Sequence, residues 1–313
     1  MQAMHPRAET PSALHRLALH QSGLVALDQC RELGLSDKDV RGLVARCRWR
    51  RVARQVYEVR DAAPPASDLD ARRRRSAWLA MLTFGPDAVA VGRCALALHG
   101  IAGLPRTIPA EAALPGAVNR RNREGVSLRQ FDDGMVVVEM PGCRAVSVEW
   151  ALAQSVPELP HRYGLAVLDA ALRTGAVSRA SLLRSHEHAR GRRGVASRHV
   201  LWSEADARAE SPLESFARWE CIEAGVPPTM LQLPLVDGSG RVVARGDMAW
   251  WRAGGRWLVV EMDGLDVHGS PTALFADRRR QNLLTGTGAV DLLRFTSRDL
   301  GSIAGTVRRA LRS

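Results

Sequence analysis

Residues 245–269 contain side chains with the types and order expected of a metal-dependent hydrolytic site. Asp247 heads a short apolar run, Glu261 ends the next apolar run after a glycine turn, and His268 follows closely. If the two runs form neighbouring strands, these side chains can lie near one another. Carboxylates suit Mg²⁺, a bound metal can activate water, and histidine titrates near neutral pH. The alternative is a surface hairpin with solvated acids.

Glu214 is a further candidate, on a helix expected to begin beside Ser211. Ser211 is a suitable N-cap, Pro212 suits the first helical position, and Glu214 is placed to close a capping box. One interpretation of Glu214 is therefore purely structural. The other places its carboxylate on the helix flank that faces the metal site.

Several elements must position these acids. We expect a hairpin to carry Asp247 and Glu261, a helix to carry Glu214, and residues 292–295 to form an apolar strand bordering the core. A helix around residues 277–284 would pack on the sheet. These elements predict a mixed sheet with flanking helices over residues 206–313.

The segments that support this interpretation stand in one order along the chain: SPLES (211–215) with Arg218, AGVPP (224–228), Gln232, ARGDMAW (244–250), VVEMDG (259–264), His268, Asp277, Arg280, Leu284 and LLRFTSRDL (292–300). Residues 211–300 resemble the endonuclease-like domain related to very-short-patch repair endonucleases, within the wider PD-(D/E)XK nuclease group. The resemblance implies a restriction-endonuclease-like α/β sheet domain that cleaves DNA with Mg²⁺ or Mn²⁺.

The resemblance also assigns roles to residues. It implies that Asp247 and Glu261 bind the metal and that Glu214, His268 and Asp263 complete the catalytic set. The wider nuclease group has a lysine at the place of Asp263, whereas the repair-type branch uses a downstream histidine, a place that His268 fits. Arg280 is expected to reach a phosphate.

Composition and charge indicate a polyanionic partner. The chain has 313 residues, a net charge of +11 and a pI of about 10.8, a balance that favours double-stranded DNA as the partner, although biased codon usage also enriches arginine. The five cysteines form no CxxC pair, which argues against a disulfide framework and a cysteine zinc site. No apolar run is long enough for a bilayer span or a signal peptide, so we expect a cytoplasmic protein without a membrane partner.

Residues 12–60 read as a DNA-binding domain. Helices are expected over Ser12–Gln21, over Leu24–Leu33 and after the N-cap Ser36, and a β-ribbon follows. This order predicts a winged helix-turn-helix, whose third helix enters the major groove. The basic residues expected to contact DNA are Lys38, Arg41, Arg46, Arg48, Arg50, Arg51 and Arg54. The alternative is a protein-binding domain with a solvated basic face.

Residues 23–59 resemble the N-terminal domain of AbiEi-type antitoxins of type IV toxin–antitoxin systems. The resemblance implies transcriptional repression and a cognate nucleotidyltransferase-type toxin encoded in a neighbouring gene. Members of that family tend to have glycine just before the last valine–tyrosine of the wing, where this chain has Gln55. We therefore expect a differently shaped wing tip.

A linker over residues 61–75 and an AbiEi-like α+β connector over residues 76–205 separate the two ends. Arg72–Arg75 reads as the solvated start of a helix, with a phosphate-binding run as the alternative. His99 reads as a core or C-cap histidine. The sequence HEH at residues 186–188 resembles a metal clip, but solvated side chains are the expected reading. Nearby arginines at positions 190, 192 and 193 contact nucleic acid or nothing.

Two functions follow from an α+β, multidomain chain with these features. One is a metal-dependent DNA endonuclease targeted by the N-terminal winged helix, which the complete set of acids and histidine favours. The other is an antitoxin-like transcriptional repressor whose nuclease-like domain is inactive, which Asp263 and the N-terminal resemblance favour. DNA binding is common to both.

Overall fold

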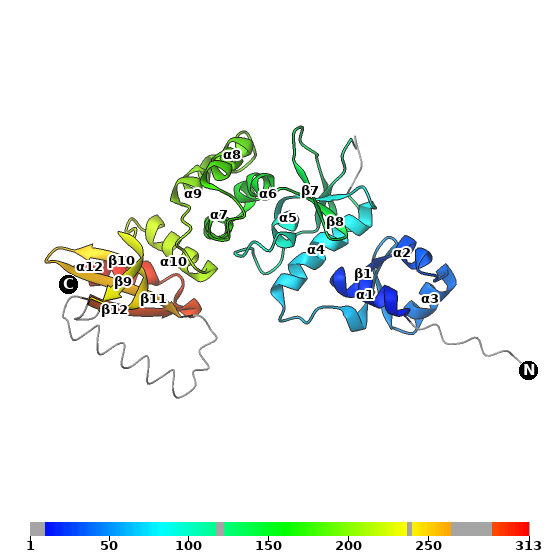
Figure 1. The fold of residues 1–313 in the computed structure, drawn as a ribbon, viewed down its shortest axis with the longest axis horizontal. Helices are drawn as coiled ribbons and strands as arrows, with labels where there is room; N and C mark the ends of the chain where they lie inside the picture. Colours follow the sequence, from blue (N-terminus) through cyan, green and yellow to red (C-terminus); the bar gives the residue numbers. More distant parts are fainter. Residues whose placement is uncertain (1–9, 117–121, 237–239, 264–289, 313) are drawn as a thin grey trace, which may run out of the picture. The chain divides into compact units, whose positions relative to one another are not determined.

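The computed structural model describes residues 10–116, 122–236, 240–263 and 290–312 (Figure 1). The chain packs as two compact units, one made of Met1–Ser155 with Arg184–Arg192 and the other of Val156–Leu183 with Arg193–Ser313. The described residues form helices and three sheets, the α+β, multidomain organisation expected from the sequence.

The first unit begins with a winged helix-turn-helix. Its core gathers apolar side chains from all of its elements, among them Leu14, Val40, Leu43 and Trp49. The three strands have the order β1-β3-β2. The elements are α1 (Ser12–His20), β1 (Leu24–Ala26), α2 (Leu27–Glu32), α3 (Asp37–Ala45), β2 (Trp49–Ala53) and β3 (Val56–Val59).

The expected helix over Leu24–Leu33 is wrong at its beginning. Leu24–Ala26 is a strand that pairs antiparallel with β3, and α2 starts only at Leu27. A short apolar run does not distinguish strand from helix by its periodicity, and here the edge of β3 supplies the hydrogen-bonding partner. The N-cap is confirmed, because the Asp39 N–H donates to Ser36 Oγ at 3.2 Å and the Ser36 N–H donates to Asp39 Oδ2 at 3.0 Å.

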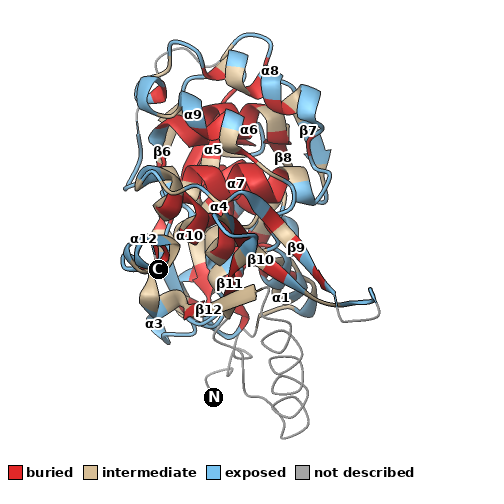
Figure 2. Ribbon diagram, turned by 90° about the vertical axis from the view of Figure 1, so that its left-hand side faces the viewer, coloured by how far each residue is buried: buried red, intermediate tan, exposed pale blue. Residues whose placement is uncertain are grey.

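The rest of the first unit is built on a five-stranded sheet with the order β6-β5-β4-β8-β7. Its helices bury most of their small and apolar residues, as the red ribbon of α5 in Figure 2 shows. The strands are β4 (Val89–Ala90), β5 (Glu111–Ala113), β6 (Ser127–Arg129), β7 (Val137–Met140) and β8 (Cys143–Val146). The helices are η1 (Arg60–Ala62), α4 (Leu69–Phe84), α5 (Gly92–Leu98) and α6 (Val148–Ser155).

Two expectations about the connector are resolved by these elements. The arginine run lies in the first half of α4, as predicted, but two of its side chains hydrogen-bond to the protein backbone. Arg73 donates to the carbonyls of Leu104 and Pro105, and Arg75 donates to the Ser22 carbonyl. His99 is the C-cap of α5, and its Nε2 donates to the Val146 carbonyl at 2.8 Å. The capping role predicted for His99 is confirmed.

The second unit contains a four-stranded mixed sheet with the order β12-β11-β10-β9. β11 runs parallel to β12, and the other neighbours are antiparallel. The strands are β9 (Met230–Val236), β10 (Val242–Arg252), β11 (Arg256–Asp263) and β12 (Val290–Thr296). The helices of the second half of the chain are η2 (Val156–Glu158), α7 (His161–Arg173), α8 (Arg179–Ala189), η3 (Val195–Ser197), α9 (His199–Glu204), α10 (Pro212–Glu223), η4 (Ser297–Asp299) and α12 (Ile303–Arg312).

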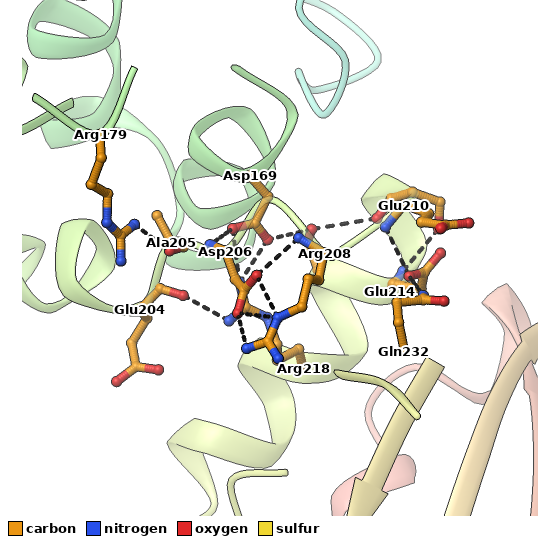
Figure 3. A network of polar contacts seen from close by, with 12 residues as sticks. Asp169, Arg179, Glu204, Ala205, Asp206, Arg208, Glu210, Glu214, Arg218 and Gln232 are labelled. Atoms are coloured by element: carbon orange, nitrogen blue, oxygen red, sulfur yellow. Dashed lines mark hydrogen bonds and ion pairs between the residues drawn. The ribbon is translucent and has the colours of Figure 1, made fainter. Parts of the chain in front are cut away.

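A buried ion pair joins α7 to α10. Asp169 and Arg218 are 1% and 5% exposed, and the guanidinium donates to both carboxylate oxygens at 2.8 and 2.7 Å (Figure 3). Ser215 Oγ and the Asp206 N–H also donate to Asp169. The residues expected to form one connector, 76–205, are thus divided, because α7 packs with the helix that flanks the C-terminal sheet.

Candidate acidic site and nucleic-acid interface

Asp247 lies in the interior of β10, where it is half-buried. Its Oδ2 accepts a hydrogen bond of 2.7 Å from the Met262 N–H on the neighbouring strand. Burial raises the pKa of the Asp247 carboxyl to about 6; the Met262 hydrogen bond opposes the rise, and the negative charge of Glu214 adds to it. The carboxyl therefore holds a proton far more readily than an exposed aspartate does.

Glu214 enters the same neighbourhood from the first turn of α10. Ser211 Oγ caps this helix by accepting from the Glu214 N–H at 3.2 Å. The Glu214 carboxylate does not complete the expected capping box but accepts from the Glu210 N–H at 2.9 Å (Figure 3). Burial raises the pKa of the Glu214 carboxyl as well. The backbone of Glu214 thus takes part in capping the helix, as the structural interpretation expects. Its carboxylate contacts Gln232 of the sheet, as the site-facing interpretation expects.

Gln232 on β9 links these two acids. Its Nε2 donates to Glu214 Oε2 at 3.0 Å and makes a longer contact of 3.5 Å with Asp247 Oδ1. Its backbone has a φ of 55°, the left-handed region that non-glycine residues rarely adopt. Such strain persists where the surroundings impose it, often at functional sites. Gln232 stands among the residues that carry the resemblance, but the sequence does not predict its place between the two acids, since neither the backbone strain nor the bridging contact has a sequence pattern.

Glu261 belongs to the same sheet face as Asp247. The last cross-strand pair of β10 and β11 is Met248 with Val260, and the next residues in this register are Asp247 and Glu261. Glu261 is 6% exposed, and its Oε2 lies 3.1 Å from Arg294 Nε on β12. The apolar run at residues 292–295 predicts the strand that contains Arg294, but it does not predict the ion pair with Glu261.

The remaining expected site residues have less structural support. Asp263 ends β11 as a half-buried residue opposite Thr296 on β12. His268 and Arg280 lie outside the described residues. Over the described ranges, no group of three histidine, cysteine, aspartate or glutamate side chains is arranged to hold a metal ion.

The donor set of the acidic site fits a divalent cation in part. Asp247 and Glu214 are hard oxygen donors whose pKa values are raised by burial, and a nearby positive ion would favour their ionised forms. Glu261 already has a cationic neighbour in Arg294. Asp247 has no ion-pair partner among the described residues, whereas Glu261 would have to exchange its contact with Arg294 before it could contact a cation.

The winged helix exposes all seven basic residues expected to contact DNA. They are Lys38, Arg41, Arg46, Arg48, Arg50, Arg51 and Arg54. Among the described side chains, Lys38, Arg41, Arg48 and Arg54 form no ion pair, so their charges are available to phosphates. By contrast, Arg50 is paired with Glu58 at 3.1 Å and Arg51 with Glu124 at 3.0 Å.

The wing tip keeps a left-handed turn without glycine. Gln55 has a φ of 59°, and its carbonyl accepts from the Leu27 N–H at 2.8 Å. The left-handed conformation that glycine would adopt freely is therefore imposed on glutamine. The altered tip shape expected from Gln55 stays a prediction.

The HEH segment makes protein contacts. The His188 ring stacks on Trp150, with centroids 4.0 Å apart, and its Nε2 lies 3.2 Å from Glu149 Oε1. Glu187 pairs with Arg190 at 2.8 Å. These contacts agree with a structural role for the segment. Arg192, one of the nearby arginines, is bound to Asp132.

Two proteins of Mycobacterium tuberculosis, named uncharacterized proteins Rv2248 and MT2308, are similar to this chain. Each is 31% identical over 234 residues, which cover 73% of this chain and 83% of the relative. No family model matches the chain. None of the described helices combines the length and the apolar character needed to cross a membrane.

Proposed function

This chain belongs to the family of the mycobacterial proteins Rv2248 and MT2308, and from its own residues we propose that it is a DNA-binding protein with a metal-dependent DNA-cleaving site. Residues 12–60 bind the double-stranded substrate. The acids gathered by α10, β10 and β11 belong to the cleaving site. The observation that carries the proposal is the pair Glu214 and Asp247, which Gln232 links and whose pKa values burial raises.

The basic surface of the winged helix supports the DNA-binding half. Lys38 and Arg41 lie on the solvent side of α3. Arg48 directly precedes β2 of the wing, and Arg54 follows β2 in the turn to β3. Guanidinium and ammonium groups without ion pairs among the described residues can neutralise phosphates and release counterions. The apolar side of α3, with Val40 and Leu43, holds that helix against the domain core.

The acidic site supports the cleaving half. Asp247 and Glu261 are the carboxylates assigned to a Mg²⁺ or Mn²⁺ ion, with Glu214 beside them and Asp263 at the strand end. Such an ion, when bound, supplies activation of water and offsets charge on the phosphoryl group. Gln232 orients Glu214 and Asp247 through its amide. His268 is assigned to accept the proton of the attacking water, and Arg280 to contact a phosphate.

Cleavage of DNA by the full chain tests this proposal. Supercoiled plasmid, linear duplex, mismatched duplex and single strands are each incubated with Mg²⁺, Mn²⁺ or a chelator. The proposal expects nicked or linear products that need the metal and disappear in Asp247→Ala. Binding without cleavage on every substrate would contradict the enzyme assignment.

A second function, transcriptional repression, is favoured by one specific observation. Glu261 is paired with Arg294, and the place at which the wider nuclease group has a lysine holds Asp263. Both features reduce the capacity of the site to act on a phosphodiester. In this alternative the C-terminal sheet domain contacts DNA or a partner, such as a nucleotidyltransferase-type toxin encoded by a neighbouring gene.

Footprinting separates the two functions. The repressor alternative expects one protected site upstream of the chain's own coding sequence, with protection lost when Lys38 and Arg41 of α3 are replaced by alanine. It also expects the footprint to be unchanged in Asp247→Ala. Metal-dependent cleavage together with the absence of a specific footprint would support the endonuclease function instead.

A further inference from the structure

A cavity in the first unit is not used by the proposed function. It has a volume of about 660 Å³, within the range of small-molecule sites, which is roughly 300–1,000 Å³. Its walls come from α2, the wing tip, the C-terminal half of α4 and the β7–β8 hairpin. The cavity thus contacts both the helix that precedes α3 and the elements that support the winged helix.

Helix α4 contributes aromatic and thioether side chains to the lining of the cavity. Trp78, Met81 and Phe84 of α4 line it and are 4%, 5% and 6% exposed, and Met140 lines the side formed by the hairpin. Methionine side chains adapt to ligands of irregular shape, and aromatic faces attract cations. The Phe84 ring already has such a contact, because the Arg123 guanidinium carbon lies 5.6 Å from its centroid.

Charged side chains of both signs line the cavity. Glu32 and Glu139 form no ion pair within the described part of the chain, Asp28 pairs with Arg31, and of the two arginines only Arg144 lies near a carboxylate. Arg144 donates to the Pro86 carbonyl at 3.1 Å and lies 3.7 Å from Asp87, and Arg123 donates to the Thr83 carbonyl at 3.2 Å. Among the described residues, a ligand with a positive charge would therefore meet two carboxylates without ion pairs and one arginine, Arg123, that is not neutralised by a carboxylate.

We propose that this cavity binds an organic cation with aromatic groups. The aromatic groups would contact Trp78, Met81 and Met140, and the positive charge would lie toward Glu32 and Glu139. Cys143, half-buried in the same cavity, provides an internal reporter, because a bound ligand shields its thiol. Cys47 is exposed and does not line the cavity, so it serves as the matched control thiol.

Calorimetry with probes of similar shape and opposite charge tests the proposal on the full chain. Tetraphenylphosphonium should bind and tetraphenylborate should bind at least tenfold more weakly, a difference of about 1.4 kcal/mol. The variant Glu32→Gln/Glu139→Gln should weaken tetraphenylphosphonium by about tenfold, as expected for two exposed charge contacts. Asp133→Asn, which removes an exposed acid away from the cavity, should leave binding unchanged.

Alkylation gives an independent readout that does not depend on DNA. Bound tetraphenylphosphonium should slow the labelling of Cys143 while Cys47 reacts at its usual rate. No binding of the cation, equal binding of both probes, or equal protection of the two thiols would overturn the proposal. A change in DNA affinity on cation binding would additionally show that the cavity is coupled to the winged helix. Only this measurement of DNA affinity rests on the proposed function.

Discussion

Glu214 on α10 and Asp247 on β10 share the side-chain amide of Gln232, which lies 3.0 Å from a Glu214 oxygen and 3.5 Å from an Asp247 oxygen. The amide lies between two groups that repel each other when both are ionised, as the contribution of Glu214 to the raised pKa of Asp247 indicates. Because Gln232 adopts a left-handed backbone conformation within a strand, this arrangement has a conformational cost. A regular strand does not require this backbone conformation at Gln232, so the residue is held in it while its side chain contacts both acids.

The raised pKa of Asp247 predicts a specific pH dependence of stability. The pKa is about 6 in the folded protein against an ordinary 3.8, so the folded state holds the proton more tightly in that interval. The contribution of this group to the free energy of unfolding is present below about pH 4 and is lost as the pH rises through about 6. Asp247→Asn should remove this loss and raise stability near pH 7.5, on the order of 1 kcal/mol after solvent screening.

Denaturant unfolding at about pH 4.5 and about pH 7.5 measures this difference. Asp299→Asn is the matched control, because hydrogen bonds from Thr296 lower the pKa of Asp299. That group stabilises the fold above its unfolded pKa, so its removal should destabilise the protein at neutral pH. Equal effects of the two substitutions would contradict the assignment of Asp247 as a destabilised carboxylate.

The buried ion pair between Asp169 and Arg218 predicts a large loss when one partner is removed. Asp169→Asn should cost about 3–5 kcal/mol, because Arg218 is left with a buried charge. Asp169→Leu combined with Arg218→Met should recover part of this stability, because no buried charge remains, while Ser215 Oγ and the Asp206 N–H lose their acceptor. Hydrogen exchange of the α7 and α10 amides reports the effect locally. A double variant as unstable as Asp169→Asn would argue against this account.

The exposed arginines of the winged helix predict salt-dependent DNA binding. Arg41→Ala/Arg48→Ala should weaken binding to duplex DNA and lower the slope of log K against log salt by about 1.8, or 0.9 per phosphate contact. Fluorescence anisotropy over a salt series measures both quantities. Arg106→Ala/Arg173→Ala removes the same charge from exposed sites outside the winged helix. The same loss in this control would show an effect of net charge alone.

Gln55 predicts a stabilising substitution at the wing tip. Gln55→Gly should raise the free energy of unfolding by about 0.5–1 kcal/mol, because a side chain in the left-handed region costs energy that glycine avoids. The carbonyl that accepts from Leu27 is kept. Thermal unfolding of Gln55→Gly beside Gln55→Ala gives the test, and a glycine variant no more stable than the alanine variant would refute the argument.

Local sequence chemistry predicted the parts of the fold that depend on neighbouring residues. Ser36 and Ser211 were identified as N-caps because the cap and its recipient lie within one turn. Val40 and Leu43 were placed on the buried side of α3 by helical periodicity. Asp247, Glu261 and Glu214 were identified as candidates from their order along the chain.

The parts that were not predicted depend on partners distant in sequence. Leu24–Ala26 becomes a strand because β3 offers an edge, and no local pattern records that edge. Gln232 and Arg294 enter the acidic site through strand pairing and through a strained backbone angle. The Asp169–Arg218 pair, which assigns α7 to the second unit, likewise joins residues far apart along the chain.

The central claim is that Asp247 anchors a DNA-cleaving site, and single-turnover cleavage tests it most directly. The full chain, Asp247→Asn and the control Asp299→Asn are compared on one duplex with Mn²⁺, after each is shown to fold and to bind that duplex. The account predicts cleavage by the wild type and by Asp299→Asn, and a rate reduced by at least 10²-fold in Asp247→Asn, as expected when a metal-linked group is lost. Cleavage by Asp247→Asn at the wild-type rate would contradict the claim.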